Sequence, residues 1–158
     1  MILISPYSRK LRNGNKNPKN YPYWENLIKM LKEIDKDIIQ IGIDNEKRLV
    51  SNFKKNLPLQ NIKKLISMSN IWISIDNFLP HVSYHLQKQG IVLWGHSDPI
   101  IFGYPENINL LKNRKYLRKN QFDTWENCEY NEDAFVKPGI IINELNLLNY
   151  EQILKREG

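Results

Sequence analysis

The sequence predicts an α/β fold in which a Rossmann-like parallel open sheet is flanked by helices. Short apolar runs that suit strands alternate with segments of helical periodicity, and Gly, Asn, Asp and Pro separate them. At 158 residues, the chain is long enough to bury a core without disulfides. Its single cysteine, Cys128, forms no internal disulfide, so we expect a reducing, cytoplasmic location.

Apolar spacing predicts the elements of the first third of the chain. Ile2–Ser5 suits a strand, and the polar loop Pro6–Asn20 follows it. Helical spacing of apolar residues predicts a helix over Tyr23–Ile34. Ile38–Ile41 predicts a strand that is buried on both faces. Asn45–Lys54 is then expected to form a second helix.

The middle of the chain continues the alternation. We expect helices over Asn61–Ser69 and Pro80–Gln89 and strands over Ile71–Ile75 and Ile91–Trp94. A further strand is expected near Asn107–Leu110. Strands that alternate with helices in this way form βαβ units, which place the strands parallel.

Two parts of one domain are expected. Residues 1–111 are predicted to form a Rossmann-like core, and residues 112–158 a C-terminal extension packed on the same domain. The extension includes Tyr116–Asn131, which is rich in aromatic and charged residues. Ile140–Leu148 suits either a strand or a helix.

The net charge of +6 is concentrated in two basic clusters that contain no acidic residue. These clusters are Arg9, Lys10, Arg12, Lys16 and Lys19, and Lys112, Arg114, Lys115, Arg118 and Lys119. Basic clusters bind phosphate, although they also occur as plain solvated surface. A nucleic-acid partner is disfavoured because the basic residues lie in loops and no nucleic-acid-reading motif is present. The apolar runs are too short to span a membrane.

Polar loops follow the predicted strands where ligands bind parallel sheets, at the strand C-termini. Asp76 directly follows one strand, and His81 lies in the first turn of the next helix, whose N-terminus suits an anion. The alternative is that Asp76 caps this helix and His81 packs on the surface. Gly95-His96-Ser97-Asp98-Pro99 follows the next strand, and it suits either close backbone approach to a phosphate or an ordinary turn.

Taken in order, these loops resemble the C-terminal, donor-binding domain of family 9 (heptosyltransferase-type) GT-B glycosyltransferases. That family carries strand-Pro-Gly-Ser and a Lys before aromatic-Pro-x-x-Trp, then Asp-Ser-Gly-x-x-His, then Gly-x-Thr-Asp-Pro. The matching segments are Ser5–Ser8 with Lys19–Trp24, Asp76–His81, and Gly95–Pro99. Gln40-Ile41-Gly42 resembles the strand that precedes a Glu-bearing helix. The resemblance covers residues 1–110 and implies one half of a GT-B fold.

The resemblance implies that a nucleotide sugar is the donor substrate and that there is no cofactor. No metal is expected, because no grouping of His and Cys has the spacing of a zinc site. Asp76 and His81 would then be catalytic, helping to remove a proton from an acceptor hydroxyl. The remaining loop residues would contact the ligand, and they are Ser8, Arg9, Lys19, Gly42, Asn77, Gly95, His96, Ser97 and Asp98.

The sequence departs from the family pattern in ways that keep a second function open. Tyr7 replaces a Gly, and Asn77-Phe78 replaces Ser-Gly. The acceptor-binding half of the GT-B fold has no counterpart in these residues, so a transferase would need a homo-oligomer or a partner chain to complete its site. The alternative is a non-catalytic binder, a sponge or sensor, of a nucleotide-derived ligand.

Overall fold

The computed structural model describes residues 1–157 and confirms the predicted fold class. A single open sheet has the strand order β3-β2-β1-β4-β5-β6, and all its neighbouring strands are parallel. This is the strand order of the Rossmann fold. The strands are β1 (Ile2–Ser5), β2 (Ile38–Gly42), β3 (Asn52–Lys55), β4 (Ile71–Ile75), β5 (Ile91–Trp94) and β6 (Ile108–Leu111).

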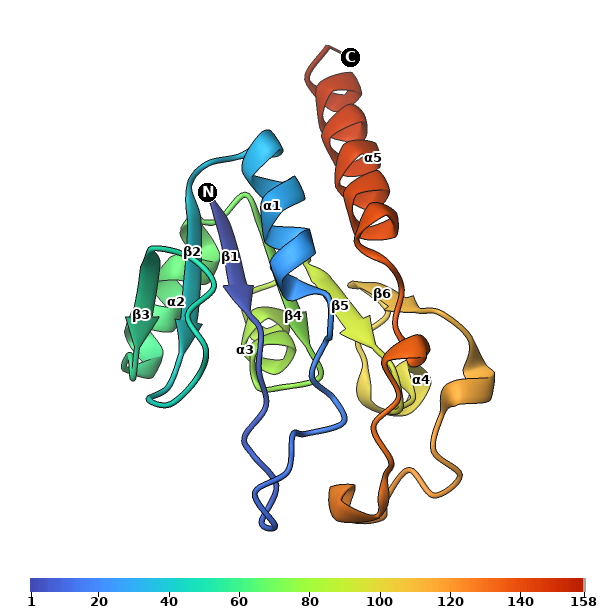
Figure 1. Ribbon diagram of the computed structural model, residues 1–158. Helices are drawn as coiled ribbons and strands as arrows, with labels where there is room; N and C mark the ends of the chain where they lie inside the picture. Colours follow the sequence, from blue (N-terminus) through green and yellow to red (C-terminus); the bar gives the residue numbers. More distant parts are fainter. Residues whose placement is uncertain (158) are drawn as a thin grey trace.

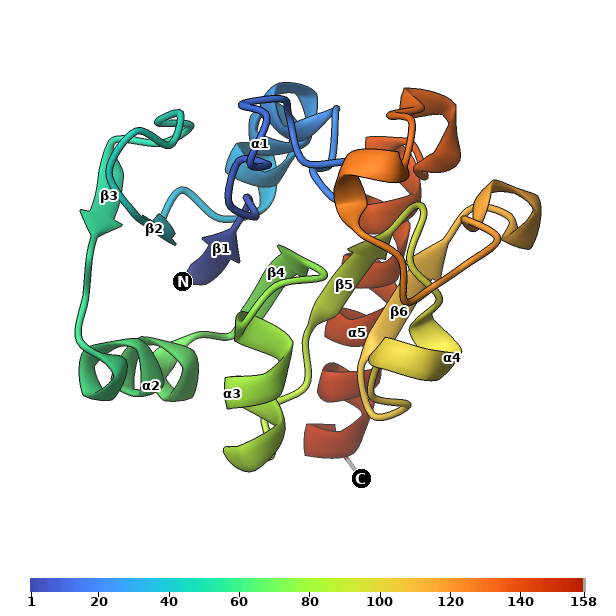
Figure 2. The ribbon, with the colours of Figure 1, turned by 90° about the horizontal axis from the view of Figure 1, so that it is seen from below.

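Helices cover both faces of the sheet, as Figures 1 and 2 show. The helices are α1 (Trp24–Ile34), α2 (Leu59–Met68), α3 (Leu79–His85), α4 (Pro99–Phe102) and α5 (Pro138–Glu157). One face packs against α1 and α5, and the other packs against α2, α3 and α4. No helix within residues 1–157 combines the length and the apolar character that crossing a membrane requires.

Alternation along each strand divides the core into two layers. In β1, Ile2 and Ile4 pack toward α1 and α5, whereas Leu3 packs toward α2 and α3. Successive side chains of a strand point to opposite faces, so a strand covered on both sides is apolar at most of its positions. Trp72 and Trp94 fill the second layer and are fully buried.

The predicted helix over Asn45–Lys54 is wrong. The chain from 43 to 51 is an irregular connection, and its end forms the edge strand β3. The fully buried side chain of Gln40 in β2 holds this connection, because its Nε2 donates to the Lys47 carbonyl at 2.9 Å and its Oε1 accepts from the Leu49 amide at 2.8 Å. Asn45 also has a φ of 69°, which is incompatible with a continuous helix.

The segment after β6 contributes to the core. Phe135 is fully buried, and Ile141 and Leu145 of α5 lie in the same cluster as Leu27 and Leu31 of α1. Ile140–Leu148, which suited either a strand or a helix, is therefore helical and lies within α5. The expected strand near Asn107–Leu110 is β6.

Two long segments meet at the C-terminal edge of the sheet. The loop 6–23 leaves β1 there, and the segment 112–137 returns across the same edge before α5 begins (Figure 1). The Tyr21 hydroxyl joins them by donating to the Val136 carbonyl at 2.8 Å, and the Lys16 ammonium donates to the Tyr130 hydroxyl at 3.0 Å. The candidate site lies among these segments.

Candidate nucleotide site

The strand order reverses between β1 and β4, so the loops that follow these two strands border the crevice where such sheets bind ligands. Asn77 joins them. Its Nδ2 donates to the Ser5 carbonyl at 3.1 Å and to Ser5 Oγ at 3.0 Å, while its Oδ1 accepts from the Leu79 amide at 3.0 Å. Asn77 therefore holds the two strand ends together and stabilises the turn that leads into α3.

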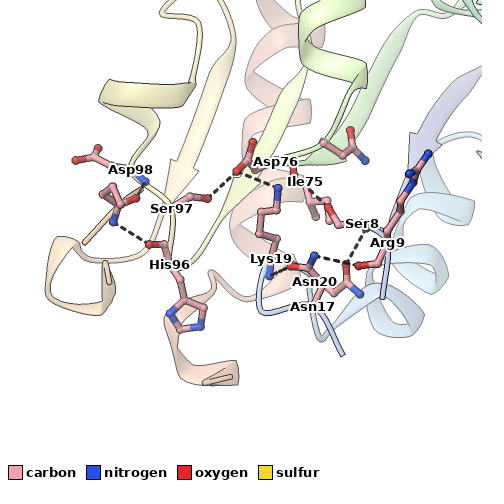
Figure 3. A network of polar contacts seen from close by, with 12 residues as sticks. Ser8, Arg9, Asn17, Lys19, Asn20, Ile75, Asp76, His96, Ser97 and Asp98 are labelled. Carbon is pink, nitrogen blue, oxygen red and sulfur yellow. Dashed lines mark hydrogen bonds and ion pairs between the residues drawn. The ribbon is translucent and has the colours of Figure 1, made fainter. Parts of the chain in front are cut away.

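Asp76 is the centre of a polar network that Figure 3 shows. Its Oδ2 accepts a hydrogen bond from Ser97 Oγ at 3.0 Å and lies 3.6 Å from Lys19 Nζ. Its carbonyl accepts from Ser8 Oγ at 3.2 Å. The structure thus brings together Ser8, Lys19, Asp76 and Ser97 from three separate loops. The Asp76 side chain is only 16% exposed, and its charge is balanced by Lys19.

His81 lies in the first turn of α3, as expected, but is not part of this network. Its Nδ1 lies 2.7 Å from the Tyr104 hydroxyl, and the two rings pack edge to face. Within the described residues this is the only hydrogen bond of the His81 side chain, and the residue is exposed. His81 and Asp76 therefore do not form a hydrogen-bonded acid–base pair in this structure.

Gly95 and His96 are covered by the segment that precedes α5. A Cβ at Gly95 would lie 2.5 Å from the Phe135 ring, so Gly95 provides space for Phe135. The Nε2 of His96 accepts from the Asn131 amide at 3.3 Å, and its Nδ1 lies 3.1 Å from the Tyr116 carbonyl. Burial lowers the pKa of His96, which favours the neutral ring.

Asp98 has a structural role at the start of α4. Its carboxylate accepts from the Ile100 amide at 3.0 Å and pairs with both terminal nitrogens of Arg114, at 3.0 and 2.6 Å. The hydrogen bonds from Arg114 lower the pKa of Asp98. The side chain of Gln121 adds a link, because it accepts from the Asp98 amide at 2.9 Å and donates to the His96 carbonyl at 3.1 Å.

An open cleft of about 650 Å³ lies beside this network, over the C-terminal ends of β1 and β2. Cationic and acidic side chains both line it, and Lys47 is paired with Glu25. The cations are Arg9, Lys10, Lys16 and Lys47; the acids are Glu25, Asp44 and Glu46. Tyr7 and Tyr23 contribute aromatic surface, and Ser8 lies at its border with the Asp76 network.

Glu46 is a cleft residue that the sequence analysis did not assign to the site. It folds back over the end of β2, where its Oε2 accepts from the Ile43 amide at 3.2 Å. A Cβ at Gly42 would lie 1.9 Å from that oxygen, so Gly42 makes room for Glu46. Burial raises the pKa of Glu46, and burial together with the Glu46 charge raises the pKa of Tyr7 to about 12. The available signal was an acidic residue shortly after the second strand of a Rossmann order.

Among residues 1–157, no three or more His, Cys, Asp or Glu side chains gather as a metal site would require. Comparison with protein-family models, with curated proteins and with solved structures gives no match for this chain. The resemblance to family 9 glycosyltransferases therefore remains a prediction from motifs.

Proposed function

We propose that this domain binds a nucleotide, with its nucleoside in the cleft over β1 and β2 and its phosphates toward the basic loop. One observation carries the proposal: the cleft lies at the strand C-termini of a Rossmann sheet and presents cations beside a carboxylate. A nucleotide needs both, because its phosphates are anionic and its ribose hydroxyls are hydrogen-bond donors.

The phosphate end of the ligand is assigned to Ser8, Arg9 and Lys10. Arg9 and Lys10 are exposed and line the cleft. A charge-assisted hydrogen bond from such a group contributes about 1.5–3 kcal/mol to binding. Arg9 suits this role because its planar guanidinium can contact two phosphate oxygens at once.

The ribose is assigned to Glu46. In Rossmann folds, an acidic residue beyond the second strand accepts a hydrogen bond from the ribose 2′-hydroxyl. Glu46 holds that position, and its Oε2 is oriented by the Ile43 amide. The half-buried ring of Tyr7 borders the same space and offers a surface for the base.

A non-catalytic binder fits this geometry better than a transferase. Asp76 is already bonded to Ser97 and paired with Lys19, and His81 bonds Tyr104, so neither side chain is poised as a free base. Glycosyl transfer is the second candidate, favoured by the placement of a carboxylate at the end of β4 beside Ser97, in the register of the family 9 motifs. A homo-oligomer or a partner chain would then supply the acceptor half.

Calorimetry with ribonucleotides and their 2′-deoxy counterparts tests the binding proposal. Arg9→Ala should weaken nucleotide binding by tenfold or more, because about 1.5–3 kcal/mol of charge-assisted bonding is lost. Glu46→Gln should reduce the preference for ribose over deoxyribose. Lys64→Ala on α2, an exposed residue outside the cleft, is the control and should bind as wild type does. A wild-type protein that binds no member of the panel contradicts the proposal.

Release of nucleoside diphosphate from nucleotide sugars separates the two candidates. A binder releases none from any donor, with or without acceptor sugars. If wild type releases nucleoside diphosphate and Asp76→Asn does not, the protein is a transferase and the binder proposal is wrong. The amide of Asn keeps the shape of the Asp76 side chain but not its charge.

A further inference from the structure

We propose that the site accepts a single nucleotide and rejects ligands that carry a sugar or a second nucleoside beyond the phosphates. The inference rests on the proposed nucleotide site and narrows its ligand class. It follows from the way the C-terminal segment 112–137 occupies one half of the crevice.

A Rossmann sheet has two nucleotide-binding halves that meet where the strand order reverses. In this chain the half formed by β1, β2 and β3 carries the open cleft. A group attached beyond the phosphates would cross from Ser8 toward the ends of β4 and β5, in the direction of Asp76 and Ser97. Ser8 bonds Asp76, so the two halves are in direct contact there.

The chain itself fills the second half. Phe135 lies against the backbone of Gly95, where a ligand would otherwise approach, and is fully buried. Both ring nitrogens of His96 face backbone groups of the C-terminal segment, those of Tyr116 and Asn131. The polar groups that follow β5 are thus already paired within the protein.

The same segment also covers the Asp76 network. The Arg118 guanidinium lies 3.5 Å from the centre of the Trp125 ring, and Lys19 Nζ lies 5.4 Å from that centre. Arg118 is fixed in turn by the carbonyls of Asp123 and Gln121, at 2.8 and 2.7 Å. Trp125 therefore lies beside Lys19, the cation paired with Asp76, and stacks with Arg118 in the place that we assign to the first group beyond the phosphates.

Charge-matched ligands give a direct test on the full chain by calorimetry. The β-methyl esters of UDP, GDP and ADP carry the same charge as UDP-glucose, GDP-mannose and ADP-glucose but place only a methyl group beyond the diphosphate. For the base that binds, we expect the methyl ester to bind at least tenfold more tightly than the nucleotide sugar. Equal affinities overturn this inference alone. Binding of none of these compounds, nor of UDP, GDP or ADP, overturns the proposed function and this inference with it.

Two aromatic substitutions test whether the segment 112–137 causes the difference in affinity between methyl ester and nucleotide sugar. Trp125→Ala should improve nucleotide-sugar affinity by threefold or more and leave methyl-ester affinity unchanged. Phe122→Ala is the matched control, since this ring is 78% exposed and packs on Phe102 of α4 rather than over Asp76. If the ratio of methyl-ester affinity to nucleotide-sugar affinity is the same in Trp125→Ala as in Phe122→Ala, the segment does not cause the difference, and the inference fails.

Discussion

At the scale of single residues, His96 has a structural role, because both nitrogens of its ring face backbone groups of the C-terminal segment. The Asn131 amide can only donate, so the His96 Nε2 that receives it must be unprotonated. The proton of the neutral ring is then on Nδ1, where it is donated to the Tyr116 carbonyl. Protonating Nε2 would break the bond to Asn131 and place a charge in a buried site.

We predict that His96 makes the fold sensitive to mild acid. Burial lowers its pKa in the folded state below the ordinary value of 6.5, so the unfolded chain binds a proton that the folded chain rejects. The contribution of neutral His96 to the free energy of unfolding is complete above pH 6.5 and is lost as the pH falls through the folded-state pKa. Urea unfolding at pH 7.5 and 5.5 measures this loss.

The His96→Gln variant should be less stable than wild type at pH 7.5 but should lose less stability on acidification. His85→Gln, which replaces an exposed histidine of α3, should retain the wild-type pH response. The same acid response in His96→Gln as in wild type would show that other groups cause it.

At the scale of elements, the connection from β2 to β3 shows most clearly how tertiary contacts override local preference. The sequence predicts a helix over residues 45–54, which span this connection and most of β3, yet the amide of Gln40 makes two hydrogen bonds to the backbone of the connection. Val50 of this connection is buried in the core. The position of Glu46 in the cleft depends on this irregular path.

Replacing Gln40 by Leu should destabilise the fold by about 1–3 kcal/mol, because it leaves the part-buried Lys47 carbonyl and Leu49 amide without their side-chain partner. Urea unfolding measures the change, and faster proteolysis within 43–51 should accompany it. Gln89→Leu is the control: its exposed amide bonds only the Glu106 carbonyl, so we expect an effect near 0.5 kcal/mol or less. Equal losses in both variants would contradict the structural role of Gln40.

At the scale of the whole molecule, the C-terminal segment and the Rossmann sheet share one core. Phe135, Ile141 and Leu145 pack with residues of α1 and of four strands. A segment that contributes fully buried side chains to a common core should unfold with it and not before it.

Phe135→Ala should therefore lower the stability of the entire domain, by about 3–5 kcal/mol for a buried aromatic ring. Tryptophan fluorescence and far-ultraviolet circular dichroism should report coincident urea transitions in wild type and in the variant. Phe122→Ala, an exposed aromatic of the same segment, should change the midpoint little. An early transition that leaves the sheet intact would mean that residues 112–157 form a separate unit.

The sequence alone determined the α/β class, five of the six strands and the positions of the polar loops, because strand and helix periodicities are local properties of the chain. It also placed Asp76 and Ser97 at strand ends that parallel pairing brings side by side. Only the tertiary structure decided that β3 replaces a helix, that Glu46 turns into the cleft, that Phe135 covers the end of β5 and that Trp125 packs against Lys19. These features depend on contacts between residues far apart in the chain, such as Phe135 with Gly95, and no local pattern encodes which distant segment fills a given space.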